Sequence, residues 1–185
     1  MTSNRHANDR REFLKNLRQS RRFLDRPVPQ DIVDDLIAAA RTVRDGEDPA
    51  SWQFLVIDDL ATKQALSGVG AFTEFLANVA VAIVVVVNGD GTPSKANVEG
   101  RIADRIMLAA GRHGLGGGSG WFGADDAQAR ARDILGLPGH RQVLVVVGVG
   151  YVDESAPGEE SSSLQRVRKS LDDLAGNRKP RDRNS

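Results

Sequence analysis

Apolar residues along this chain follow two spacings, and each spacing predicts a different kind of element. Helical spacing marks residues 29–43 and 97–114, which are expected to be amphipathic helices. The expected inward residues are Ile32, Leu36, Ile37 and Ala40 in the first helix, and Ile102, Ile106, Leu108 and Ala109 in the second. Shorter helices are expected from near Arg10 to before Arg21, at 61–70, and at 126–136, where Gly136 ends the last one.

Three stretches rich in β-branched residues predict strands at 52–58, 79–88 and 141–152. The last two are apolar at nearly every position, which is typical of strands buried on both faces. Residues 115–123, by contrast, predict a glycine loop. Helices that alternate with a few buried strands indicate an α/β or α+β layered domain, and so small a sheet often gains burial by dimerising.

Composition narrows the classes of function. The chain has 185 residues with 25 basic and 25 acidic side chains, so no net charge favours nucleic acid or a membrane surface. The absence of cysteine excludes disulfides, thiolate catalysis and zinc–cysteine sites. The start lacks an apolar signal segment, and the longest apolar run, 79–87, is about half the length of a membrane helix. We therefore expect a cytoplasmic protein, with a single domain over 10–175 and disordered tails at 1–9 and 176–185.

Two groups of arginines are candidate anion ligands. Arg18, Arg21 and Arg22 lie close together, with Gln19 and Ser20 between them. Guanidinium forks with a neighbouring hydroxyl suit a phosphate monoester, although a solvated helix end is the alternative. A second group, Arg166 and Arg168, lies near the other end of the chain. The sequence leaves open whether the two groups meet on one anion.

The glycine-rich stretch 114–120 is a further candidate, because Trp121 and Phe122 follow it directly. Glycines permit close backbone approach to a ligand, whereas a flexible turn is the alternative. The histidines, such as His113 at a helix end, have no metal-ligand spacing, and no nucleophile motif is present. If the protein is an enzyme, we expect its reactive atoms to belong to a bound cofactor rather than to a metal or a nucleophile.

Taken in order, five stretches resemble the nitroreductase family of flavin enzymes. They are RQSRRFLDRPVPQDIVDDLIAAAR, WQFLVID, EGRIADRIMLAAGRHGLG, ILGLPGHRQVLVVVGVGY and RKSLDD, and together they cover most of the region 17–174. The resemblance implies an α+β three-layer sandwich with a small mixed sheet flanked by helices, working as an intertwined homodimer. It also implies FMN at the subunit interface, reduced by NADH or NADPH, and electron transfer to a nitroaromatic, a quinone or another small acceptor.

The resemblance also implies which residues contact the cofactor. Arg18 and Gln19 fall at positions for the FMN phosphate, within an opening motif that includes Ser20, and Arg21 falls near N1 and O2 of the ring. A cation at N1 would favour the negative charge of reduced flavin. The other matching positions are Arg166 and Arg168 for the phosphate, and Gly116, Gly117, Gly118 and Ser119 along the ring.

The stretch 44–51 departs from the family pattern, although Trp52 keeps the register. Asp45, Asp48, Ala50 and Ser51 replace the family's Ser, Asn, Gln and Pro. An ionised Asp48 only accepts hydrogen bonds, so it can pair with the flavin N3–H but opposes an anionic reduced ring. The leading hypothesis is an FMN-dependent NAD(P)H oxidoreductase. The alternatives are a non-catalytic relative that sequesters flavin or serves as a structural subunit, and a specialised flavin dehydrogenase of a natural product.

Overall fold

The computed structural model describes residues 9–14, 17–43, 52–88 and 93–155. Residues 1–153 group into one compact unit and 154–185 into a second, and the account below concerns the first. The expected tails at 1–9 and 176–185 lie almost wholly outside the described residues, so the domain boundaries stay a prediction.

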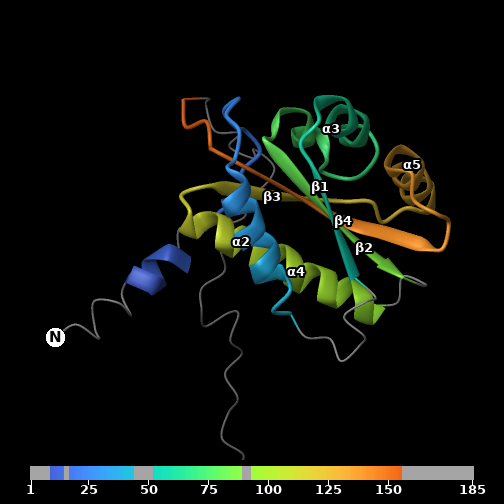
Figure 1. Cartoon of the computed structure of the whole chain (residues 1–185), viewed down its shortest axis with the longest axis horizontal. Coiled ribbons are helices and arrows are strands. Elements are labelled where there is room, and N and C mark those ends of the chain that lie inside the picture. Colours follow the sequence, from blue (N-terminus) through green and yellow to red (C-terminus); the bar gives the residue numbers. More distant parts are fainter. Residues whose placement is uncertain (1–8, 15–16, 44–51, 89–92, 156–185) are drawn as a thin grey trace, which may run out of the picture. The chain divides into compact units, whose positions relative to one another are not determined.

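A four-stranded sheet forms the centre of the compact unit (Figure 1). Its strands are β1 (Trp52–Ile57), β2 (Val81–Asn88), β3 (Gly116–Trp121) and β4 (Arg141–Gly150), and their spatial order is β1-β2-β4-β3. All three pairings are antiparallel, so the described strands do not form the mixed sheet that the resemblance implied. The parallel contact among these residues is an isolated bridge between Gln19 and Gly117.

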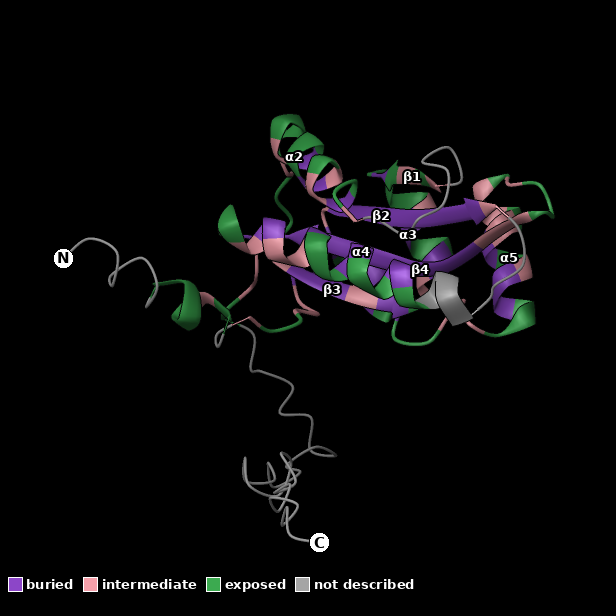
Figure 2. Ribbon diagram, turned by 90° about the horizontal axis from the view of Figure 1, so that it is seen from below, coloured by how far each residue is buried: buried purple, intermediate pink, exposed green. Residues whose placement is uncertain are grey.

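Helices cover both faces of the sheet, which gives the expected three-layer α+β arrangement (Figure 2). One face packs against α2 (Gln30–Ala40) and α4 (Pro93–Arg112). The other packs against α3 (Leu60–Ser67), the 3-10 helix η2 (Glu74–Asn78) and α5 (Asp125–Leu135). Valines of β2 and β4 alternate between the two cores because successive strand residues point to opposite faces, and almost all of them are buried.

The helices expected at 29–43, 61–70, 97–114 and 126–136 are present as α2, α3, α4 and α5, with small differences in their bounds and buried faces. The helix expected from near Arg10 to before Arg21 is a correction: residues 9–14 are helical, but residues 17–20 are not, because Gln19 and Ser20 pair with Gly117 of β3 instead. In α2 the fully buried residues are Val33, Leu36 and Ala40, whereas Ile32 and Ile37 pack at the margin of the core. In α4 the buried residues include Ile102, Ile106 and Ala109, as expected, and Leu108 is only half-buried. Gly136 ends α5 in the left-handed conformation (φ 63°), which confirms its predicted role. No helix in the described part of the chain is long and apolar enough to cross a membrane.

The stretch expected to be a glycine loop is the strand β3, which is a correction. Glycine has a low strand propensity, so the glycine-rich composition of 115–123 favours a loop over a strand. The strand forms because β4 offers a long apolar edge, and six residue pairs from Gly116↔Gly150 to Trp121↔Val145 are in register along it. Pairing with a neighbouring strand has therefore overridden local propensity.

Lys63 is a buried cation that the sequence did not single out. Only 7% of the residue is exposed, and its Nζ donates hydrogen bonds to the carbonyls of Val79 (2.8 Å) and Ala80 (3.0 Å). Burial lowers the pKa of Lys63, while the carboxylates of Asp58 and Asp59 oppose that shift. The ammonium thus ties α3 to the backbone just before β2.

We expect Lys63→Met to lower the free energy of unfolding by about 1–3 kcal/mol, because it leaves two carbonyls without their donor. Urea denaturation of the purified protein measures this. Gln64→Met, at the exposed neighbouring position of the same helix, is the matched control and should change stability little. Equal stabilities for the two variants would show that the Lys63 hydrogen bonds contribute nothing.

Candidate functional site

The segment that carries the N-terminal arginines lies along β3. The Ser20 N–H donates to the Gly117 carbonyl (2.8 Å), and Gln19 forms its parallel bridge with the same residue. Beyond it, Phe23 bridges Val152 and the Leu24 N–H donates to the Tyr151 carbonyl (2.8 Å). Two stretches about a hundred residues apart in sequence are thereby held side by side.

The glycines of β3 permit this close approach. A Cβ on Gly116 would lie 2.6 Å from the Ser20 Oγ, and one on Gly118 would lie 2.4 Å from the Ser20 carbonyl oxygen. On the opposite face, a Cβ on Gly117 would lie 2.9 Å from the Met107 side chain. The side-chain space at all three glycines is therefore filled by the protein itself. Direct contact between Gly116, Gly117 or Gly118 and a cofactor stays a prediction.

The Arg21 guanidinium joins three separate segments. Its Nη1 donates to the carbonyls of Ser119 (2.8 Å) and Phe72 (3.3 Å), and its Nη2 donates to the Gln19 Oε1 (2.9 Å). The Ser119 N–H also donates to that Gln19 oxygen, at 3.3 Å. One planar fork thus fixes the positions of the opening segment, β3 and the turn before η2.

The environment of Arg21 is partly apolar. Its guanidinium carbon lies 4.5 Å from the centroid of the Phe75 ring, a cation–π contact. Burial lowers the pKa of Arg21, and the nearby Glu74 carboxylate opposes that shift. A guanidinium remains protonated at neutral pH in spite of such a shift, so the site holds a fixed positive charge beside an aromatic ring.

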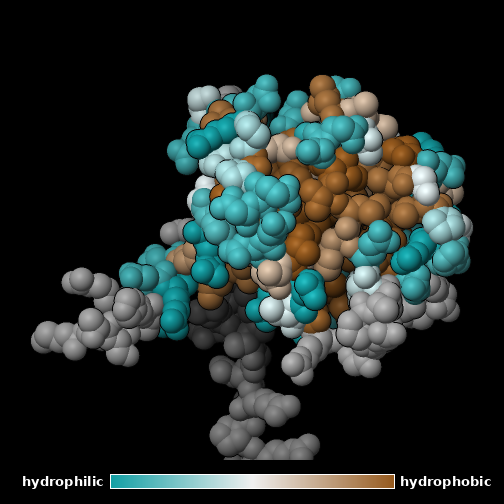
Figure 3. Space-filling view, viewed as in Figure 1, coloured by the Kyte–Doolittle hydropathy of each residue, from teal (hydrophilic) through white to brown (hydrophobic). Residues whose placement is uncertain are grey.

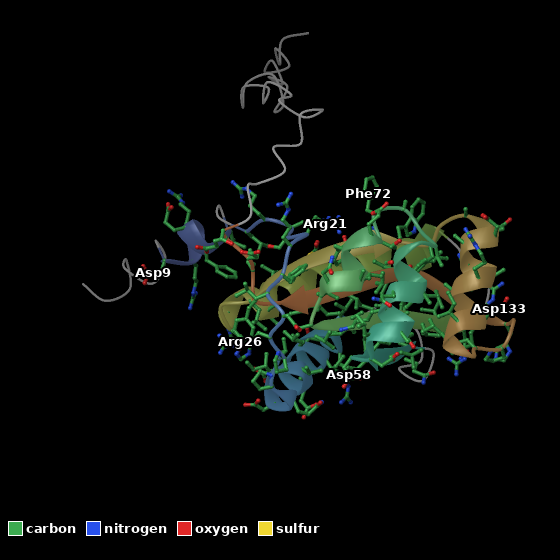
Figure 4. All side chains as sticks on the ribbon, turned by 90° about the horizontal axis from the view of Figure 1, so that it is seen from above. Asp9, Arg21, Arg26, Asp58, Phe72 and Asp133 are labelled. Atoms are coloured by element: carbon green, nitrogen blue, oxygen red, sulfur yellow. The ribbon has the colours of Figure 1, made fainter. Side chains whose placement is uncertain are left out.

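An open pocket of about 550 Å³ lies beside this guanidinium, within the range of small-molecule sites. Figure 4 shows Arg21 and Phe72 together at one edge of the molecule. One part of the wall is polar and the other is aromatic and aliphatic. The lining residues are Gln19, Arg21, Phe72, Ser119, Gly120, Trp121 and Val145.

The structure brings together some of the residues expected from the sequence. Gln19, Arg21 and Ser119 line the pocket, whereas Ser20 is directed at Gly116 and does not line it. Arg18 is exposed, and its Nη1 donates to the Leu17 carbonyl at 2.8 Å. Asp48, Arg166 and Arg168 lie outside the described residues, as does the whole altered stretch 44–51. The shared phosphate site and the role of Asp48 therefore stay predictions.

Sequence reasoning missed Phe72 and Val145 as pocket residues, whereas Gly120 belongs to the candidate stretch 114–120. Phe72 stands among small residues in a short connection, and no sequence signal reveals the exposure of its ring or its positive φ. Of the aromatic pair after the glycines, Trp121 lines the pocket but Phe122 is fully buried in the core beside α5. The adjacent positions point to opposite faces because both belong to extended backbone.

The remaining candidates have structural roles. The His113 Nε2 lies 3.0 Å from the Asp35 Oδ2, so it joins the end of α4 to α2. Among the described residues, no cluster of His, Asp and Glu has the geometry to hold a metal ion.

Comparison with known proteins points to one family, although no family model matches the chain. The chain is 28% identical over 153 residues to a protein of Methanothermobacter thermautotrophicus, covering 80% of this chain and 78% of that one. It is 29% identical over 149 residues to one of Archaeoglobus fulgidus, covering 76% and 83%. Both relatives are named as candidate NADH dehydrogenases/NAD(P)H nitroreductases.

Among solved structures, the chain is similar to the FMN-dependent nitroreductase of Clostridium difficile R20291. The TM-score is 0.71 and the sequence identity 25%, and the match covers 86% of this chain and 96% of that one. The match therefore extends over nearly the whole of the solved chain. In sequence and in fold, the chain is similar to proteins of the nitroreductase family.

Proposed function

We propose that this protein is an FMN-dependent oxidoreductase that passes electrons from NADH or NADPH to a small organic acceptor such as a nitroaromatic or a quinone. The observation that carries the proposal is the pocket beside Arg21, which combines hydrogen-bond donors with an aromatic wall. The names of the two curated relatives and of the Clostridium difficile protein support the same chemistry.

The donors at the pocket suit the flavin. Three of the five N–H groups of Arg21 donate hydrogen bonds within the protein, two from Nη1 and one from Nη2. The Nε–H and the second N–H of Nη2 make no hydrogen bond to the described residues. The Gln19 side-chain amide keeps its NH₂ donors, because only its oxygen is engaged within the described chain. The electron-rich N1/O2 edge of a flavin accepts hydrogen bonds, so the donor set fits it.

The rest of the wall is apolar. Phe72, Trp121 and Val145 offer aromatic and aliphatic surface on the other part of the pocket. Gln19, Arg21 and Ser119 are the residues that would hold the ring edge, and Arg18, with Arg166 and Arg168 from the sequence resemblance, would hold the phosphate. When bound, FMN supplies the two-electron chemistry that couples a nicotinamide to an acceptor.

The protein's own contribution is electrostatic and positional. The fixed cation of Arg21 favours negative charge at the ring edge, and its bonds to two carbonyls keep it in place without rearrangement. The Gln19 amide is oriented by Arg21 and by the Ser119 N–H, so its NH₂ group presents donors at a defined position.

The direct test is the colour and activity of the purified protein. We expect the purified protein to be yellow, or to be colourless and to bind added FMN. The FMN-loaded protein should then oxidise NADH or NADPH in the presence of a quinone. In the overall reaction NAD(P)H and one proton reduce the quinone to the hydroquinone and leave NAD(P)⁺. A protein that binds no FMN in a titration followed by flavin fluorescence would contradict the proposal.

The phosphate assignment makes a separate prediction. We expect Arg18→Ala and Arg168→Ala each to weaken FMN binding by at least about tenfold, because each removes a charge-assisted hydrogen bond to the phosphate. Arg130→Ala removes an exposed arginine of α5 and is the matched control. Unchanged affinity in Arg168→Ala would show that the C-terminal arginine does not contact the phosphate.

We also propose that the protein is a homodimer that uses the face carrying α2. The residues Trp52, Phe54 and Val56 of the edge strand β1 alternate onto that face, and their exposure reaches 43% at Val56. Figure 3 shows a broad apolar area over the strands of the sheet beside α2. Apolar surface of this extent is typical of an interface with another chain.

Light scattering after size-exclusion chromatography at micromolar concentration should give twice the chain mass. We expect Val56→Asp to shift the protein toward monomer, because a charge would be buried without a partner. Gln53→Asp, an exposed position on the same strand that points to the other face, is the control and should leave the dimer intact. A monomeric parent protein would refute the dimer.

A further inference from the structure

Phe72 has an unusual backbone and an unusual exposure. Its φ is 59°, and among the described residues it is the one non-glycine with positive φ. For a bulky aromatic residue this conformation is an outlier that costs free energy. Burial of the side chain does not offset this cost, because the residue is 70% exposed. That is the largest exposed fraction among the exposed large hydrophobic residues described. The ring therefore contributes little to the core while its backbone is strained.

The surrounding structure holds this conformation from both sides. The preceding residue, Ala71, exchanges two backbone hydrogen bonds with Trp121, at 2.7 and 2.9 Å. The following residue, Thr73, is fully buried, and its Oγ1 contacts the carbonyls of Ser67 (2.9 Å) and Gly70 (3.0 Å). The Phe72 carbonyl itself accepts from the Arg21 Nη1. Strained backbone that several surrounding contacts hold in place is found mainly at functional sites.

Trp121 is seated beside Phe72 by two glycines. A Cβ on Gly123 would lie 2.3 Å from the indole ring, so the ring rests directly against that backbone. A Cβ on Gly70 would lie 2.4 Å from the Trp121 carbonyl oxygen, the atom that accepts from Ala71. Trp121 is 54% exposed, and both aromatic residues line the same open pocket.

We propose that Phe72 and Trp121 bind the flat ring of the electron acceptor, and that Phe72 determines which acceptors are used. The inference rests on the proposed oxidoreductase function and names the residues that select its second substrate. The donors of Gln19 and Arg21 suit the cofactor edge, which leaves the exposed aromatic part of the wall for a ligand that enters and leaves. A flat ring stacks on such a wall, whereas a compact hydrated ion gains nothing from it.

The kinetic test compares two acceptors in the FMN-loaded protein. Menadione is a flat quinone that takes two electrons and two protons, from NADH and one added proton. Two ferricyanide ions take the same two electrons from NADH and release one proton, and they do not stack. We expect Phe72→Asn to raise the KM for menadione by about fivefold, since stacking on one aromatic ring contributes roughly that much, with ferricyanide reduction within about twofold of the parent.

A second measurement does not depend on turnover. Without NADH, menadione should raise the midpoint of thermal unfolding of the FMN-loaded parent, and this rise should be lost in Phe72→Asn and kept in Phe72→Tyr. In the absence of menadione, Phe72→Asn should unfold at the same or a higher temperature than the parent, because Asn tolerates positive φ better than Phe. Leu60 is another exposed apolar residue, and it lies outside the pocket lining. Leu60→Asn is therefore the control, and it should change neither the KM for menadione nor the rate of ferricyanide reduction.

Three results would overturn the inference. One is an equal effect of Phe72→Asn on menadione and on ferricyanide. Another is a menadione-induced thermal shift that persists in Phe72→Asn, and the third is a clear loss of stability in that variant without ligand, which would make the ring structural. If the parent binds FMN but oxidises neither NADH nor NADPH with either acceptor, the proposed function fails, while the thermal shift still decides whether Phe72 binds a flat ring.

Discussion

The hydrogen bonds of the Arg21 guanidinium are the interaction on which the candidate site depends. They connect the opening segment to Ser119, 98 residues later, and to Phe72, 51 residues later. The planar guanidinium fork reaches carbonyls on two segments and an amide oxygen on a third, in one fixed plane.

The centre of the sheet and the candidate site are built from different residue types. The centre of the sheet consists of valines that are buried on both faces, and such strands have no polar group to offer a ligand. The pocket lies instead at β3, the edge strand in the order of the sheet, where glycines replace side chains. Their missing side chains let the opening segment lie directly on the strand, so polar groups from the start of the chain reach a scaffold built by its second half.

Much of the fold was readable from spacing. The helix α4 and the strands β2 and β4 were predicted because long periodic or β-branched stretches leave few alternatives. The strand β3 was not, because its formation depends on the edge of β4 and not on its own residues. The site divides in the same way. Gln19, Arg21 and Ser119 came from a motif, whereas Phe72 depends on a backbone angle imposed by contacts with β3, which a single sequence does not encode locally. The resemblance also supplied residues of the stretches 44–51 and 156–185, which the structure does not describe.

The long separation between Gln19 and Ser119, 100 residues, has a consequence for biosynthesis. A ribosome releases the arginine segment early, but the backbone that receives it is translated only when most of the chain exists. Until then the guanidinium of Arg21 lacks its carbonyl partner on β3, and the backbone at Phe72 lacks the Ala71–Trp121 hydrogen bonds that hold it. Closing so long a loop is slow, because the entropy of the intervening chain is lost before the contacts form. Because β4 (Arg141–Gly150), the partner of both β2 and β3, is translated later still, neither the complete sheet nor the ligand pocket can form before it.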